Sequence, residues 1–274
     1  MPELPEVETI VRELRPNVVG KKFWKVDGKL HYVFLPSFEE MTAKIKGLKV
    51  LEITRRGKFI VFVLDNKMRL VIHLRMSGRL MWKKVPKKEQ HIRAMFTFSD
   101  GTSLIFSDAR KFGRIWLFSE KDYEKETGIV RLGVEPFSSD FTQEKLNKLF
   151  AHKRGILKNT LLRQDLIAGI GNIYADEICY RIHLHPSSRL EHLNAKDFEN
   201  MYEAILHCLG EGIEHCGASV SDFVGTRGTL GKHQKYLQAY GRKDDPCYVC
   251  GSIIKKTKVA GRGTFVCMKC QILK

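Results

Sequence analysis

The sequence lacks any hydrophobic run long enough to cross a membrane, since no apolar stretch approaches about 18 residues. It also lacks a lipidation signal, and residues 1–20 carry charges throughout, unlike a secretory signal peptide. Its cysteines number seven, and an odd count without a secretory signal argues against a disulfide framework. No internal repeat is apparent. We therefore expect a cytoplasmic, nucleoid-associated protein with reduced cysteines.

Acidic side chains are in short supply. The chain has 31 Asp and Glu against 47 Lys and Arg, which gives a net charge of +16. A solvated surface does not need this imbalance, whereas a polyanionic partner would use it, and nucleic acid is the usual one. An anionic membrane surface is the competing interpretation, which the missing membrane signals disfavour. A length of 274 residues favours two domains.

The first half of the chain shows one helical pattern followed by strand patterns. Residues 2–18 read as an amphipathic helix. Short apolar or alternating runs separated by turn signals then predict an antiparallel sandwich or barrel between residues 22 and 118. The predicted strands are Leu48–Ile53, Phe59–Leu64, Arg69–His73, Ala94–Phe98, Leu104–Ser107 and Ile115–Phe118. The basic stretch 83–91 is a loop, either solvated or contacting phosphate.

The second half has helical periodicity. We expect helices near Leu146–Phe150, Ile156–Leu166, Asn172–Arg181 and Asp197–Glu214. Residues 217–233 are rich in Gly, Ser and Thr, and a loop of this length is usually functional or mobile. The resulting division is a domain over 1–131, a linker over 132–144, a helical domain over 145–240 and a small module over 241–274.

The small C-terminal module contains two close cysteine pairs. Cys247 and Cys250 are followed by sixteen residues (251–266) and then by Cys267 and Cys270. This spacing is typical of a four-cysteine structural zinc site, with four free buried cysteines as the alternative. Two strands joined at residues 260–263 would form a β-hairpin that depends on zinc to fold. Arg262 at its tip would contact phosphate or a groove, or be solvated.

The N-terminus offers a nucleophile. Removal of Met1 would leave Pro2 with a free secondary amine, and an α-amino group has a pKa near 8. Such an amine can attack a sugar carbon and form an iminium, while the Glu3 carboxylate moves protons. The competing interpretation is simply a helix start, because proline and acidic residues are favoured there.

Other stretches suggest contacts to DNA. Gly169 to Glu177 places two glycines before a helix, with Asn172 as the expected N-cap, so it is either an anion site between two helices or a plain capped helix. The turns at His73–Gly78 and Asp108–Gly113 mix cations with Met76 and Phe112. Exposed apolar side chains on basic turns can wedge between base pairs, although Met76 alone reads as a core residue.

Several motifs occur in one order along the chain. They are Pro2–Glu8, Arg55–Lys58, His73–Met76, Arg110–Gly113, Gly171–Tyr174 and the four cysteines. This order resembles the formamidopyrimidine-DNA glycosylase family, bacterial enzymes that remove 8-oxoguanine, from Pro2 to Gln271. The resemblance implies an α+β fold: an antiparallel β-sandwich flanked by helices, then a helical domain with a helix–two-turn–helix motif and a zinc-finger β-hairpin. It implies a monomer that binds one structural zinc ion and double-stranded DNA containing an oxidised base.

The resemblance also implies residue roles. Pro2 would attack C1′ of a flipped-out nucleotide, Glu3 would shuttle protons and Lys58 would assist elimination, so that the strand is cut by β and δ elimination. Met76, Arg110 and Phe112 would fill the gap in the base stack, with Arg110 on the orphaned cytosine. The other implied DNA contacts are His73, His91, Lys153, Asn172, Tyr240 and Arg262, and the loop 217–233 would close over the base.

Two departures and two alternative functions remain. Many family members carry glutamate where this chain has Ser77, and the loop 217–233 follows the family only loosely. An endonuclease VIII-like enzyme for oxidised pyrimidines uses the same proline, but Leu4 and residues 110–113 favour the purine enzyme. A non-catalytic DNA-binding protein on this scaffold would not need Pro2, Glu3 and Lys58 together.

Overall fold

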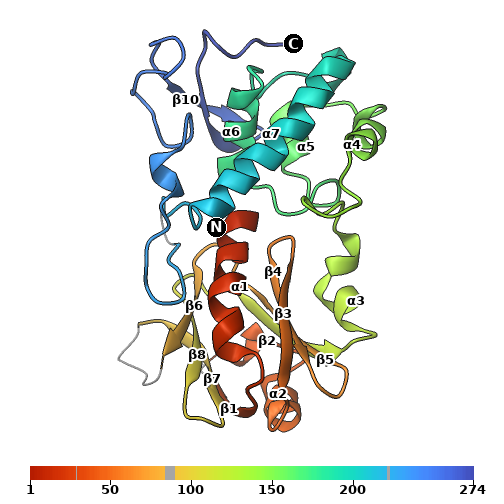
Figure 1. Ribbon diagram of the computed structural model, residues 1–274, viewed down its shortest axis with the longest axis vertical. Coiled ribbons are helices and arrows are strands. Elements are labelled where there is room, and N and C mark those ends of the chain that lie inside the picture. The colour runs from red at the N-terminus through yellow and green to blue at the C-terminus, as the bar shows by residue number, and fades with distance from the viewer. Residues whose placement is uncertain (29, 84–89, 221–222) are drawn as a thin grey trace. The chain divides into compact units, whose positions relative to one another are not determined.

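The computed structural model describes the whole chain except residues 29, 84–89 and 221–222. Most of the basic stretch 83–91 and part of the loop 217–233 therefore lie outside the described residues. The chain forms two compact units, which we name the N-terminal and C-terminal units (Figure 1). The N-terminal unit is Met1–Val130 with His215–Lys232, and the C-terminal unit is Arg131–Glu214 with His233–Lys274. Segment 215–232, which we assigned to the helical domain, thus belongs to the N-terminal unit.

The N-terminal unit contains two sheets. The first has the order β1-β7-β8-β6, with β1 Phe23–Gly28, β7 Ile92–Phe98, β8 Ser103–Asp108 and β6 Gly78–Lys83. The second has the order β2-β9-β5-β4-β3, with β2 Phe34–Leu35, β9 Arg114–Ser119, β5 Met68–His73, β4 Phe59–Leu64 and β3 Val50–Arg56. Every pairing is antiparallel except β2 with β9, which is parallel.

Apolar side chains from both sheets meet in one core. Helix α1 (Leu4–Val18) lies against β3 and β4 and buries the predicted face of Val7, Ile10, Val11 and Leu14 (Figure 1). Strand β4 is buried along almost its whole length, as expected for a continuous apolar run in a sandwich covered by a helix. The predicted sandwich is confirmed, and its α1 face fixes where the N-terminus lies within this unit.

Several short elements were not predicted. Strands β1, β2 and β6 and helices α2 (Phe38–Ile45) and α3 (Tyr123–Thr127) had no assignment from the sequence. Helix α2 nevertheless carries a capping signal, because the Ser37 hydroxyl accepts the backbone N–H of Glu40. Strand β1 has only Phe23 and Val26 buried, so its periodicity is weak.

The C-terminal unit combines helices with a hairpin. Its helices are α4 (Gln143–Phe150), α5 (Leu157–Leu161), α6 (Asn172–Arg181) and α7 (Ala195–Glu214). Strands β10 (Lys255–Val259) and β11 (Arg262–Val266) pair antiparallel, which confirms the predicted hairpin. Helix α5 is shorter than the expected Ile156–Leu166: it ends at Leu161, Leu162 is its C-cap, and residues 164–166 form a turn. Among the described residues, no helix has the length and apolar content needed to cross a membrane.

Candidate functional site

The first residues of the chain are held by hydrogen bonds at the start of helix α1. Pro2 is buried, and Glu3, the N-cap of α1, is 3% exposed. Glu3 and Glu6 form a reciprocal capping box, in which the Glu6 Oε2 atom accepts the Glu3 backbone N–H at 2.8 Å. Lys58, immediately before β4, is also buried at 6% exposure. The proposed catalytic residues are thus buried groups of one unit.

A cavity of about 390 Å³ opens beside the N-terminus. It is lined by Met1, Arg75, Met76, Phe112 and Arg114. The structure therefore brings two turns, which we name the Met76 turn (residues 74–78) and the Phe112 turn (residues 108–113), to the first residue of the chain. Met76 is 39% exposed and Phe112 is 50% exposed, so the interpretation of Met76 as a core residue is wrong.

Three cationic or imidazole residues in this region adopt left-handed backbone conformations. The φ angles are 54° at Arg75, 60° at His91 and 63° at Lys111. Non-glycine residues rarely adopt φ values in this range, because the Cβ atom crowds the following carbonyl. Arg75 and Lys111 lie within the two turns that line the cavity.

Contacts within the Phe112 turn orient its side chains. The Arg110 guanidinium lies over the Phe112 ring at 5.1 Å from its centroid. The Arg114 Nη1 atom donates to the carbonyls of Phe112 at 3.2 Å and Gly113 at 2.8 Å. The apolar Phe112 ring is thus presented on a cationic turn.

His73 is buried behind the Met76 turn. Burial, followed by the charges of Arg75 and Lys58, lowers the pKa of His73 to about 3, so the imidazole is neutral at physiological pH. Its Nδ1 atom accepts the backbone N–H of Arg75 at 3.0 Å, which leaves the Nε2 atom with the proton. His73 can therefore offer a phosphate one neutral N–H donor and no positive charge.

The remaining expected DNA contacts lie on several elements. His91 is exposed in the N-terminal unit, whereas Lys153 is exposed just after α4. Asn172 is the first residue of α6, and Gly171 is the N-cap, so our N-cap assignment is wrong. The Asn172 amide instead donates to the Gly263 carbonyl at 3.0 Å, which places it beside the hairpin tip that carries exposed Arg262. The Tyr240 ring lies 5.0 Å from that of Phe265.

Helix α6 carries two buried carboxylates that sequence analysis overlooked. Glu177 accepts the backbone N–H groups of residues 238, 239 and 240 at 2.8–2.9 Å, and burial raises its pKa. Asp176 accepts the Phe265 N–H at 2.9 Å and forms an ion pair with Lys158 at 2.6 Å. Burial, opposed by Lys158, raises the Asp176 pKa to about 7. The only indication of these carboxylates in the sequence was that two acidic residues stand side by side within the predicted helix.

The fully buried Lys158 connects helices to the hairpin. Its Nζ atom also donates to the Thr264 hydroxyl at 2.8 Å and to the Gly263 carbonyl at 3.1 Å. Lys158 lies on α5 and Asp176 on α6, so this network ties both helices to β11. It orients the hairpin tip on which Arg262 lies.

Two carboxylates of α1 hold the described part of segment 215–232. The Glu6 Oε1 atom accepts the Ala218 N–H at 2.8 Å. Glu13 accepts both the N–H of Thr226 at 2.6 Å and its hydroxyl at 2.8 Å. The Thr226 carbonyl in turn accepts the Trp82 N–H at 2.9 Å. One helix therefore anchors both the N-terminal turn and this segment.

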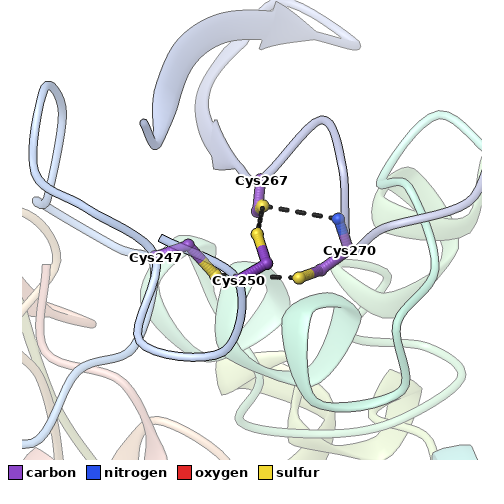
Figure 2. A group of neighbouring side chains, drawn as sticks. All are labelled: Cys247, Cys250, Cys267 and Cys270. Atoms are coloured by element: carbon purple, nitrogen blue, oxygen red, sulfur yellow. Dashed lines mark hydrogen bonds between the residues drawn. The ribbon is translucent and has the colours of Figure 1, made fainter. Parts of the chain in front are cut away.

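The four C-terminal cysteines converge as the spacing predicted (Figure 2). Their sulfur atoms lie within 4.8 Å of one another, with Cys247 to Cys270 at 3.8 Å and Cys250 to Cys267 at 3.5 Å. Zinc–sulfur bonds of about 2.3 Å in a tetrahedron place sulfurs about 3.8 Å apart, so the four thiolates fit a zinc ion. A disulfide needs about 2.05 Å, and these cysteines are free.

Comparison with protein-family models identifies three consecutive matches. The formamidopyrimidine-DNA glycosylase N-terminal domain matches residues 1–115, and the H2TH domain of the same enzymes matches residues 132–224. A zinc finger found in FPG and IleRS matches residues 244–272. The chain belongs to the formamidopyrimidine-DNA glycosylase family. The zinc-finger match and the cysteine geometry together assign one structural zinc ion to Cys247, Cys250, Cys267 and Cys270.

Individual relatives share this family name over their full length. The formamidopyrimidine-DNA glycosylase of Pelotomaculum thermopropionicum is 40% identical to this chain, and the match covers 100% of both proteins. That of Lactobacillus helveticus is 38% identical over 100% of this chain and 99% of the relative. The Lactococcus lactis Fpg bound to DNA containing N7-benzyl-Fapy-dG has a TM-score of 0.92 at 34% identity and covers 98% of this chain and 99% of that one. Other structures of that glycosylase contain abasic-site DNA or oxidised-pyrimidine DNA.

Proposed function

We propose that this protein is a DNA glycosylase of base excision repair that removes oxidised purines from duplex DNA and then cleaves the strand as an AP lyase. The observation that carries the proposal is the cavity lined by Met1, Met76 and Phe112, since Met1 directly precedes the buried Pro2 and Glu3 in the chain. The family membership and the net charge of +16 support a DNA substrate.

The reaction begins once Met1 is removed. The Pro2 nitrogen attacks C1′ of the damaged nucleotide, the glycosidic bond breaks, and the base leaves with the electron pair and takes up a proton. The C1′–O4′ bond then breaks, O4′ takes its electron pair and a proton, and the Pro2 nitrogen, having lost its own proton, is joined to C1′ as an iminium. Loss of a proton from C2′ expels the 3′ phosphate, and a second elimination expels the 5′ phosphate. Glu3 exchanges the protons at the sugar, and Lys58 assists elimination.

Each of the two units contributes residues that contact DNA. Met76, Arg110 and Phe112 fill the gap left by the flipped nucleotide, with Arg110 on the orphaned cytosine. His73, His91, Lys153, Asn172, Tyr240 and Arg262 hold phosphates. His73 does so as a neutral donor, so its removal should weaken binding without reducing the salt dependence, unlike removal of Arg262.

Borohydride trapping tests the chemistry. Protein with a free Pro2 amine should form a covalent adduct with a duplex containing 8-oxoguanine opposite cytosine. Protein that retains a Gly-Ser extension before Pro2 is the matched control, because its Pro2 nitrogen is an amide, and it should bind without trapping. Mass spectrometry of the N-terminus verifies both preparations.

A thymine-glycol duplex run in parallel tests the substrate class. A stronger adduct on that duplex would assign the protein to the oxidised-pyrimidine enzymes. Equal binding by both preparations with no adduct on either duplex would leave a non-catalytic DNA-binding protein. An adduct that forms equally with the extended protein would exclude Pro2 as the nucleophile.

A further inference from the structure

Ser77 is buried at the end of the Met76 turn and faces the Phe112 turn. Its hydroxyl donates to the Asp108 Oδ1 atom at 2.5 Å and accepts the Arg110 backbone N–H at 3.1 Å. Ser77 is adjacent in sequence to Met76, whereas Asp108 and Arg110 belong to the other turn. One hydroxyl therefore joins the two turns.

Asp108 closes the Phe112 turn from inside. It is 1% exposed at the end of β8. Its Oδ1 atom also accepts the Arg110 N–H at 3.1 Å, and its Oδ2 atom accepts the Gly113 N–H at 2.8 Å. A Cβ atom at Gly113 would lie 2.3 Å from the Phe106 ring, so the end of the turn sits tightly against the sheet.

The backbone of Asp108 also contacts a third exposed residue, His91. Its N–H donates to the His91 carbonyl at 3.0 Å, and its carbonyl accepts the Arg93 Nε–H at 2.7 Å. Asp108 thus makes contacts toward Ser77, Gly113 and His91 at once. All of these groups belong to the N-terminal unit.

We propose that Ser77 and Asp108 form a positioning pair that makes the Met76 and Phe112 turns enter the base stack as one body. The pair touches neither DNA nor the reacting atoms. It fixes the backbone on both sides of Arg110, and so determines how well Arg110 discriminates cytosine from other opposite bases. This inference rests on the proposed function and adds to it the origin of the opposite-base preference.

The chain contains a matched control for this pair at the other end of β8. The Thr102 hydroxyl donates to the Asp100 Oδ1 atom at 2.5 Å, and the Thr102 N–H donates to the same oxygen at 3.0 Å. Thr102 is 7% exposed and Ser77 is 8% exposed. Ser77→Ala and Thr102→Ala each remove a buried hydroxyl that precedes a strand of the same sheet and donates to an aspartate, and Ser77→Thr restores the donor and acceptor. The Thr102 hydroxyl also accepts the Lys21 Nζ–H at 3.2 Å, within its own end of the sheet.

The test uses the full-length zinc-loaded protein and a duplex with a tetrahydrofuran abasic analogue beside 2-aminopurine. Insertion of Met76 and Phe112 unstacks the 2-aminopurine and raises its fluorescence. Ser77→Ala should slow this rise about tenfold and lower the preference for cytosine over adenine about tenfold, the factor expected for lost hydrogen bonds to a charged group. Thr102→Ala and Ser77→Thr should stay within about twofold of the parent.

The two proposals can fail separately. If Ser77→Ala keeps both the insertion rate and the cytosine preference, or if Thr102→Ala loses them equally, the positioning role is wrong. If the parent traps no DNA with borohydride while insertion still depends on Ser77, the positioning role stands and the catalytic proposal falls. At saturating Ser77→Ala protein, trapping on a natural abasic site should remain within about twofold of the parent, since that step does not need the turns coupled.

Discussion

In each unit a buried aspartate fixes an exposed turn, Asp108 in the N-terminal unit and Asp176 in the C-terminal unit. The two units compensate the negative charge of this aspartate differently. Asp108 accepts hydrogen bonds from neutral donors, namely the Ser77 hydroxyl and the N–H groups of Arg110 and Gly113. Asp176 lies against the Lys158 ammonium group. A carboxylate surrounded by N–H dipoles needs no counterion, whereas a deeply buried pair leaves an uncompensated charge when one member is lost.

The hairpin of the C-terminal unit also differs from the N-terminal unit in the origin of its stability. The N-terminal unit has one apolar core that joins both sheets and α1. Around the hairpin, the buried cluster is small and includes two of the cysteines, with Tyr180, Ala239, Ile254 and Phe265. Small modules of this kind depend on their metal. Perturbations should therefore affect the hairpin and its contacts to α5 and α6 more strongly than the N-terminal unit, and the following experiments test this difference.

Loss of a zinc ligand should produce the largest effect. Binding of structural zinc contributes about 10–16 kcal/mol in zinc-finger peptides, so Cys250→Ser should release zinc and unfold the hairpin. We expect about 100-fold weaker DNA binding and rapid proteolysis after residue 241. Cys216→Ser, at an exposed cysteine outside the site, is the control. Undiminished DNA affinity with zinc absent would refute the hairpin's role.

Removal of the buried ammonium group should come next. At pH 9, where the Asp176 carboxyl of pKa about 7 is ionised in the parent, Lys158→Met removes its cation and should lower the free energy of unfolding by about 3 kcal/mol. The double variant with Asp176→Asn should recover most of this loss. Urea unfolding followed by circular dichroism measures both. Equal instability of the single and double variants would show that the charge is not the cause.

The N-terminal unit should show a smaller, pH-dependent effect from His73. Its folded pKa of about 3 lies below the ordinary 6.5, so the unfolded chain binds the proton more readily. This contribution to stability is complete above about pH 6.5 and is lost as the pH falls toward 3. At pH 5 the loss should be about 2 kcal/mol.

The measurement can be confined to that unit. All three tryptophans, Trp24, Trp82 and Trp116, belong to it, so their fluorescence follows its unfolding in urea. His73→Gln can still accept the Arg75 N–H, and it should remove this part of the pH dependence. The same slope between pH 6.5 and 5 in both proteins would mean that His73 is protonated in the folded state.

The anchor of segment 215–232 should give the smallest effect on stability. Glu13→Gln keeps one acceptor for Thr226 but loses the charge, and Glu13 is partly exposed, so we expect about 1 kcal/mol or less. The segment itself should open more often, which limited proteolysis within residues 215–232 detects. An unchanged cleavage rate would show that the Trp82 contact alone holds Thr226.

Sequence patterns predicted the elements that bury regular apolar faces. The α1 face, β4 and the zinc hairpin were recognised because periodicity or cysteine spacing is local. The parallel pairing of β2, the early end of α5 and the Gly171 cap depend on contacts that no local pattern contains. The carboxylate anchors were missed for the same reason, since Glu6 and Ala218 are 212 residues apart. A buried acceptor is visible only when its distant donor is placed.

The left-handed residues Arg75, His91 and Lys111 have a consequence for protein engineering. Each costs about 1–2 kcal/mol relative to an unstrained backbone, and glycine at these positions would relieve that strain. A library selected only for heat resistance should therefore accumulate glycine at these three positions. Such variants would survive higher temperatures while losing the cationic or imidazole side chains at these turns. The most thermostable variants selected in this way should therefore be among the least effective at recognising damaged DNA.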